Sequence, residues 1–150
     1  MKRILYYIPL LFSSLLLSCE KGEGEKATSL IGTWQISKVE ITTYHHSLKK
    51  EDTETISPED YYIEFKDDGK ALFFHSSSTK ETTYEFNEVA HKLYIRDTFS
   101  IYYDSEKSVS IGSITYSNYT LSSKQLILLP EGFTYGGDTS YSWKFTLEKK

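Results

Sequence analysis

Beyond Leu30, apolar residues recur at every second position along most of the chain, not at every third or fourth. These positions are filled mainly by Tyr, Phe, Ile, Val and Thr, which pack well on a pleated, half-buried surface. Such alternation places successive side chains on opposite faces of a strand. The sequence therefore predicts a domain that is almost entirely β.

The run from Tyr61 to Lys66 is the clearest strand, because one of its faces is apolar and the other is charged. It is followed by Asp67-Asp68-Gly69, and Asp-Gly between two alternating runs is a strong hairpin signal. The return strand is predicted over Lys70 to His75, with Phe73 or one of its neighbours packing inward. This hairpin is the best-defined local element of the sequence.

Similar alternation predicts further strands over Thr82–Phe86, Lys92–Arg96, Phe99–Tyr103, Val109–Leu121, Gln125–Leu129 and Tyr141–Leu147. Within Val109–Leu121 the apolar parity shifts across Gly112-Ser113, which predicts a bulge or a bend there. A total of about eight to ten strands fits a closed antiparallel sheet, with a β-sandwich as the alternative. Alternation alone does not distinguish these two folds.

The first eighteen residues have the order of a secretory signal. Lys2 and Arg3 precede an apolar run from Ile4 to Leu17, and the small residue Ser18 comes directly before Cys19. The run is shorter than the roughly 20 apolar residues that cross a bilayer. Residues 1–18 are therefore predicted to be a cleaved signal peptide.

The segment Leu16-Leu17-Ser18-Cys19 resembles the lipobox of bacterial lipoproteins. The resemblance implies thioether attachment of diacylglycerol to Cys19, cleavage before it, and acylation of the new amino group. Several acyl chains hold a protein firmly where one holds it marginally. Cys19 is the only cysteine, so the chain has no second cysteine for an intrachain disulfide or a thiolate metal site. The alternative to a lipoprotein signal is an ordinary secretory signal.

Residues 19–29 are rich in Glu, Lys and Gly and predict a flexible tether, behind which residues 30–150 form the folded domain. The expected location is the bacterial cell envelope, with the lipid in the outer membrane and the domain on its periplasmic or surface face. The tether's acidity resembles the export signals of some surface lipoproteins, and a solvated spacer explains it equally well.

The folded part opens with Gly32-Thr33-Trp34, which resembles the start of lipocalin-like domains. The strand Ile63–Phe65 leading into Asp68-Gly69, and the segment Leu121–Leu128, resemble parts of short lipocalin-like lipoproteins of Gram-negative envelopes. The resemblance implies an up-and-down antiparallel barrel whose interior holds a small apolar ligand. It also places Gly32 and Trp34 at the closed end of that barrel.

One feature of longer lipocalins is missing from the sequence. In those proteins an arginine late in the chain covers the tryptophan, whereas Arg96 is the only arginine after residue 18 and lies mid-chain. The sequence thus indicates no arginine that would cover Trp34.

The sequence contains no motif in which catalytic or metal-binding residues occur at the required spacing. His45, His46, His75 and His91 lack the spacing of metal ligands, and no nucleophile elbow, phosphate loop or dinucleotide motif occurs. The full chain has a net charge of −4, and cleavage of the signal peptide removes two cations and no acids. The mature chain is therefore more acidic still, which disfavours nucleic acid as a partner. We expect no metal, no cofactor and no enzymatic activity.

The remaining signal is aromatic, with 13 Tyr, 8 Phe and 2 Trp in the chain. These residues either half-bury on strand faces, as β-propensity favours, or line a pocket. The first hypothesis is a membrane-anchored, noncatalytic module that binds a small apolar or amphipathic molecule inside the barrel. The alternative is a protein-interaction or envelope-scaffold module without such a ligand. The expected ligand-facing residues are Ile63, Phe65, Phe73, Tyr84, Phe86, Leu93 and Ile95.

Overall fold

The computed structural model describes residues 29–76, 78–131 and 134–150, and their regular structure is entirely β. No helix in these ranges is long and apolar enough to cross a membrane. The predicted signal peptide, Cys19 and nearly all of the tether lie outside the described residues. The strands are β1 (Gly32–His45), β2 (Lys50–Ile56), β3 (Tyr61–Phe65), β4 (Lys70–His75), β5 (Ser78–Asn87), β6 (Lys92–Ile95), β7 (Phe99–Tyr102), β8 (Ser108–Ile111), β9 (Ile114–Leu121), β10 (Gln125–Pro130), β11 (Thr134–Gly136) and β12 (Thr139–Lys149).

Eight antiparallel strands close into a barrel in the order β1, β3, β4, β5, β6, β9, β10, β12. The last strand pairs with the first, from Trp34 opposite Lys149 to His45 opposite Thr139. This closure confirms the predicted barrel and rules out the β-sandwich. The barrel strands follow one another up and down, but β2, the β7–β8 hairpin and β11 are inserted between them.

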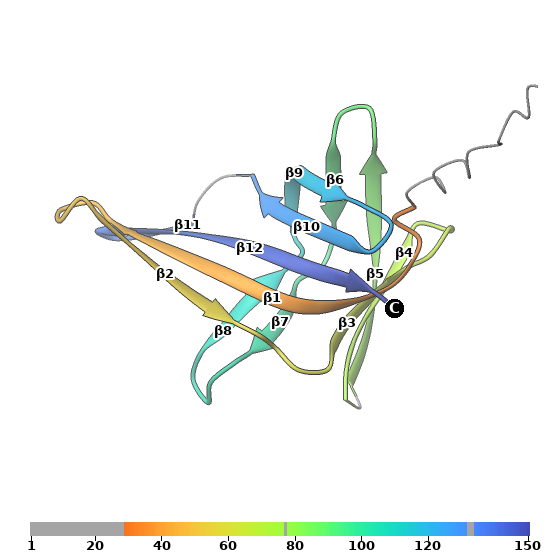
Figure 1. The fold of residues 1–150 in the computed structure, drawn as a ribbon, viewed down its shortest axis with the longest axis horizontal. Helices are drawn as coiled ribbons and strands as arrows, with labels where there is room; N and C mark the ends of the chain where they lie inside the picture. Colours follow the sequence, from red (N-terminus) through yellow and green to blue (C-terminus); the bar gives the residue numbers. More distant parts are fainter. Residues whose placement is uncertain (1–28, 77, 132–133) are drawn as a thin grey trace, which may run out of the picture.

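The inserted strands β2 and β11 extend two long barrel strands into a projecting sheet, which lies at the left of Figure 1. We call this sheet the wing; it consists of β2, β11, residues 39–45 of β1 and residues 139–145 of β12. At its tip the amide of His46 donates to the Asp138 carbonyl (2.9 Å) and that of Ser47 to the Asp138 carboxylate (3.0 Å). These bonds join the β1–β2 turn to the β11–β12 turn.

A bulge in β1 sets which side chains enter the core. The register with β12 shifts between Ile36 and Lys38, so the inward positions change from even to odd numbers there. Trp34, Ile36 and Val39 are consequently all fully buried. The same shift turns Ile41 toward the inner face of the wing.

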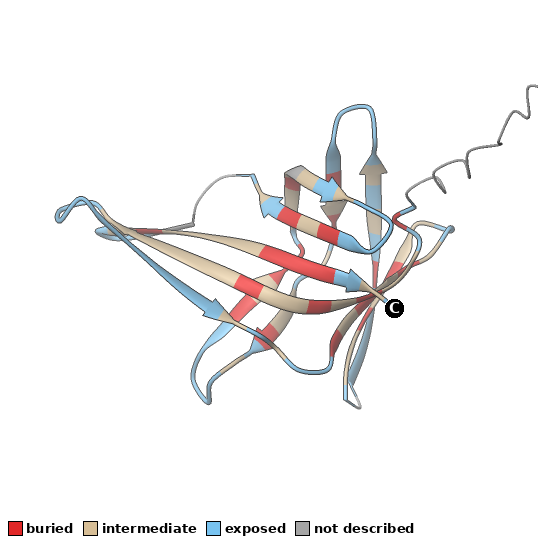
Figure 2. Cartoon of the chain, in the orientation of Figure 1, coloured by how far each residue is buried: buried red, intermediate tan, exposed pale blue. Residues whose placement is uncertain are grey.

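The hydrophobic core is formed by buried side chains of the barrel strands and of the β7–β8 hairpin. Figure 2 shows buried segments on both. The ring of Phe73 stacks on that of Phe99 from β7 at a centroid distance of 4.9 Å. The largest fully buried side chains come from both the barrel and the hairpin: Trp34, Ile36, Ile63, Phe65, Phe73, Leu93, Ile95, Ile101, Ile111, Tyr116, Leu126 and Phe145.

Both local predictions about turns are confirmed. β3 and β4 pair across Asp67-Asp68-Gly69, with Gly69 at φ 79° and the Lys70 amide donating to the Asp68 carboxylate (3.0 Å). At Gly112-Ser113 the chain bends and passes from β8 to β9, which belong to different sheets. Both residues of this bend have positive φ, 97° and 54°.

Candidate functional site

The seven residues expected to face a ligand all lie on barrel strands. Ile63, Phe65, Phe73, Leu93 and Ile95 have no exposed surface and belong to one hydrophobic core. Tyr84 and Phe86 are half-buried at the margin of that core. A ligand would reach the five buried residues only if the barrel wall or one of its ends opened. Their ligand-binding role stays a prediction.

Tyr84 and Phe86 have neighbours of their own. The Tyr84 hydroxyl donates to the Lys66 carbonyl (2.6 Å), and partial burial raises the pKa of Tyr84. The rings of Phe86 and Tyr119 lie 5.3 Å apart between centroids. These contacts give both side chains a structural role at the barrel margin.

Trp34 is fully buried near the entry of β1 and has two specific partners. Its indole N–H donates to the Leu30 carbonyl (2.8 Å), and the Lys149 ammonium lies 5.0 Å from the ring centroid. Gly32, at φ 126°, passes so close to the Lys149 side chain that a Cβ atom at Gly32 would lie 3.1 Å from Cε. The tryptophan is thus covered by a lysine from late in the chain.

One opening that combines aromatic and charged residues lies outside the barrel, between the inner face of the wing and the β7–β8 hairpin. We call it the cleft. Its volume is about 380 Å³. It is lined by Ile41, Thr43, Glu54, Tyr103, Lys107, Ser108, Val109, Ser110, Tyr141 and Trp143.

The wing wall of the cleft follows from strand register. Ile41 on β1 lies between Glu54 on β2 and Trp143 on β12, so these three side chains form one row across the sheet. One row closer to the tip, Thr43 pairs with Tyr141. The wing face therefore changes from apolar near the barrel to polar near its tip.

The hairpin wall is fixed to the barrel by contacts of β7. The Tyr102 amide donates to the Tyr61 hydroxyl (3.0 Å), and the Lys80 ammonium donates to the Thr98 carbonyl (2.8 Å). Tyr61 also stacks on His75, at 3.9 Å between ring centroids. These contacts support a wall that contributes Lys107, Ser108, Val109 and Ser110 to the lining of the cleft.

One polar group beside the cleft lacks a partner. The Trp143 indole N–H is buried, and no described residue accepts a hydrogen bond from it. Leaving a buried donor unpaired costs about 1–3 kcal/mol. A ligand acceptor that displaced the atoms covering this N–H would recover part of that free energy.

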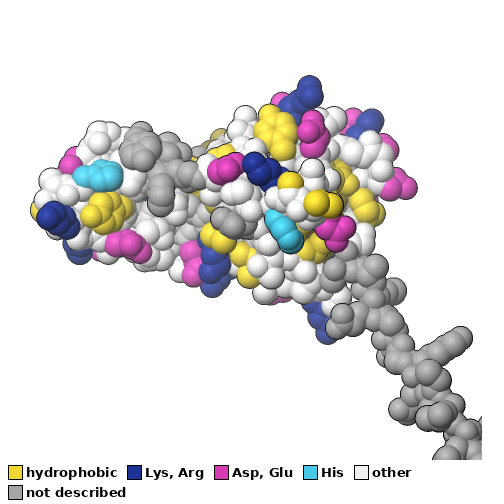
Figure 3. Space-filling model, turned by 90° about the horizontal axis from the view of Figure 1, so that it is seen from above, with side chains coloured by type: hydrophobic (Ala, Val, Ile, Leu, Met, Phe, Trp, Pro, Cys, Tyr) yellow, Lys and Arg dark blue, Asp and Glu magenta, His cyan; other side chains and the backbone are white. Residues whose placement is uncertain are grey.

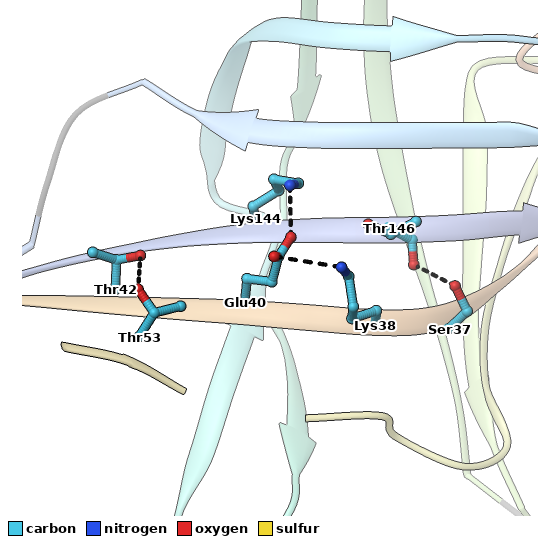
Figure 4. Close-up of polar contacts among 7 residues, drawn as sticks. All are labelled: Ser37, Lys38, Glu40, Thr42, Thr53, Lys144 and Thr146. Atoms are coloured by element: carbon cyan, nitrogen blue, oxygen red, sulfur yellow. Dashed lines mark hydrogen bonds and ion pairs between the residues drawn. The ribbon is translucent and has the colours of Figure 1, made fainter. Parts of the chain in front are cut away.

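A second polar cluster lies on the outer face of β1 and β12 (Figure 4). The Glu40 carboxylate pairs with the Lys144 ammonium (2.6 Å) and the Lys38 ammonium (3.4 Å), and Ser37 donates to the Thr146 carbonyl (3.1 Å). The hydrogen bond from Lys144 is the main cause of the lowered pKa of Glu40. Because both lysines already face one carboxylate, the cluster acts as a structural clasp between strands.

We expect Lys144→Met to raise the pKa of Glu40 toward its ordinary value of 4.5. The lowered folded-state pKa means that the pair stabilises the fold above the unfolded-state pKa of Glu40. That contribution is lost as the pH falls through the folded-state pKa. A carbon-detected NMR titration of the carboxyl group measures the shift. Lys50→Met, which removes the 2.8 Å partner of Asp52, is the matched control and should leave Glu40 unchanged.

Other ionisable groups in the described part of the chain are dispersed. No three His, Cys, Asp or Glu side chains gather there as metal ligands would. Burial raises the pKa of Tyr116, whose hydroxyl accepts from the Gly112 amide (2.9 Å). Its role is to hold the bend between β8 and β9.

Comparison with known protein families, with curated proteins and with solved structures found no match to this chain.

Proposed function

We propose that this chain is a noncatalytic binding module that holds a small amphipathic molecule in the cleft. The observation that carries the proposal is the lining of the cleft, in which the aromatic residues Trp143, Tyr141 and Tyr103 occur together with the aliphatic residues Ile41 and Val109. Ligand pockets are mostly apolar and aromatic, with a few polar groups that fix orientation. Glu54 and Lys107 supply such groups here.

The size of the cleft supports a small ligand. A volume of about 380 Å³ lies near the lower end of the range for small-molecule sites, about 300–1,000 Å³. This favours a single-chain or compact amphiphile over a lipid with two long chains. In this proposal the barrel supports the wing and the hairpin.

The lipocalin-like relationship and the membrane anchor belong to the same proposal. The Gly32-Thr33-Trp34 entry and the cover of Trp34 by Lys149 support the relationship. The lipobox-like segment before Cys19 supports lipidation and an outer-membrane location in the cell envelope. Cys19→Ala is expected to release the protein from washed membranes into the soluble fraction; an unchanged membrane fraction would refute the anchor.

The alternative, an interaction or scaffold module, has one supporting observation. The side chains of Leu48 and Tyr102 are 70% and 65% exposed, which is unusual for large apolar groups. They lie on separate elements, and hydrophobic side chains on the face in Figure 3 are interspersed with charged ones. A docking surface is expected to be contiguous, so we place the ligand-binding function first.

Native mass spectrometry of the mature Cys19→Ala protein, exported and purified gently, tests the cleft proposal. We expect an added mass that disappears on denaturation and is absent from Trp143→Ala, which removes a cleft wall. Phe74→Ala is the matched control, because Phe74 stacks on Tyr62 (5.1 Å between centroids), is half-buried and does not line the cleft. A bare wild-type mass, or retention by Trp143→Ala, would contradict ligand binding in the cleft.

A further inference from the structure

The two walls of the cleft carry opposite charges. On the wing wall the only charged residue is Glu54, from β2, whereas the hairpin wall has Lys107 from the turn between β7 and β8. Both side chains are exposed at the cleft and therefore accessible to a bound molecule. The cleft is thus electrically polarised from one wall to the other.

Neither of these two charges is neutralised by another described side chain. Among the other acids on the wing strands, Asp52 pairs with Lys50 (2.8 Å) and Glu40 pairs with Lys144, whereas Glu51 forms no ion pair with a described residue. Glu54 and Lys107 form no ion pair within residues 29–76, 78–131 and 134–150. Two unpaired charges facing one cleft are available for ligand groups of opposite sign.

The aromatic residues of the wing wall suit a cation. Trp143 lies across Ile41 from Glu54 in one row, and Tyr141 lies on the same face one row closer to the tip. Aromatic faces attract cations, as a carboxylate does. On the hairpin wall Lys107 supplies the charge, since the other residues that line this wall, Tyr103, Ser108, Val109 and Ser110, are uncharged, and its ammonium donates hydrogen bonds to anions. The wing wall therefore favours a cationic group and the hairpin wall an anionic one.

We propose that the ligand of the cleft is a zwitterion with an apolar body, whose cationic group faces Glu54 and whose anionic group faces Lys107. This inference rests on the proposed function and specifies the chemical class of its ligand. A purely anionic amphiphile is repelled by the unpaired Glu54 carboxylate, and a purely cationic one is repelled by the Lys107 ammonium. Only a molecule with both charges satisfies both walls.

The test compares decylphosphocholine, decanoate, decyltrimethylammonium and decyl maltoside, which share one chain and differ in headgroup. Each is titrated below its micelle concentration into the mature Cys19→Ala protein, with binding followed by calorimetry. The zwitterion is expected to bind about three- to fivefold more tightly than either singly charged probe, a factor that reflects solvent screening of exposed charges. Higher salt should reduce this preference.

Charge variants separate the two walls. Lys107→Met should weaken the binding of the zwitterion and of decanoate by about three- to fivefold without weakening the binding of the cation. Glu54→Gln should weaken the binding of the zwitterion and of the cation without weakening the binding of decanoate. Lys92→Met, at an exposed position outside the cleft, is the matched control. Equal binding of all four probes, or an unchanged ranking of the probes in both variants, would overturn the proposal of a zwitterionic ligand but not the proposal that the cleft binds a ligand. No binding of any probe would overturn both.

Discussion

Gly112→Ala is expected to lower the free energy of unfolding by about 3–5 kcal/mol, combining backbone strain with overpacking. Gly112 is buried at φ 97°, a conformation that residues with a side chain rarely adopt. A Cβ atom there would lie 2.1 Å from the Asp97 carbonyl oxygen, so the backbone itself would have to move. Urea unfolding followed by circular dichroism measures the loss.

Gly137→Ala provides the matched control for this substitution. Gly137 also has positive φ, 63°, but a Cβ there meets no atom within 4 Å. Its loss should be about 1–2 kcal/mol, from the left-handed backbone alone. Similar losses for the two variants would show that Gly112 is not packed against the Asp97 segment as described.

Trp34→Ala is expected to cost about 3–5 kcal/mol, the range for removing a buried large aromatic side chain. The substitution leaves a cavity under the entry of β1 and removes the hydrogen bond to the Leu30 carbonyl and the contact with Lys149. Small domains are stable by about 5–15 kcal/mol, so the variant should be folded but marginal. The midpoint of urea unfolding reports the change.

Trp143→Ala is the control for this second prediction. Trp143 is half-buried at the cleft and its N–H has no hydrogen bond to lose, so we expect about 1–2 kcal/mol. Trp34→Phe, which keeps a ring, tests the same site if Trp34→Ala fails to fold. A negligible loss in Trp34→Phe together with less than about 1 kcal/mol in Trp34→Ala would show that Trp34 does not close the barrel.

Much of the barrel could be predicted from sequence because its strands bury one face. The alternation at Ile63 and Phe65 and the Asp68-Gly69 turn defined β3 and β4, and the parity shift at Gly112 marked the bend. Closure of β12 on β1 joins residues 94 to 115 positions apart, from His45–Thr139 to Trp34–Lys149, and no local pattern encodes that pairing. The choice between barrel and sandwich therefore required the structure.

The wing was missed for identifiable physical reasons. β2 has the sequence Lys-Glu-Asp-Thr-Glu-Thr-Ile and is exposed along nearly its whole length, so apolar alternation is absent. Such charge is typical of edge strands, which it protects from pairing with other chains. The bulge between Ile36 and Lys38 also broke the parity of β1 just before the wing begins. Edge strands and bulges carry weaker sequence signals than core strands do.

The cleft was missed because its walls are separate in sequence. Trp143 and Tyr141 belonged to a predicted strand, but nothing indicated that they extend beyond the barrel. Glu54 and Lys107 are ordinary surface residues until β2 and the β7–β8 hairpin bring them to one opening. The inward alternation of Ile63 and Phe65 correctly marked buried positions, and burial alone does not identify a binding site.

The two indole N–H signals in a ¹H–¹⁵N NMR spectrum test the central claim most directly, because Trp143 lines the cleft and Trp34 lies at the barrel entry. We expect titration with decylphosphocholine to shift the Trp143 signal progressively until it saturates, while the Trp34 signal stays in place. A shift of Trp34 without Trp143 would place the ligand at the barrel, and two unmoved signals would contradict binding in the cleft.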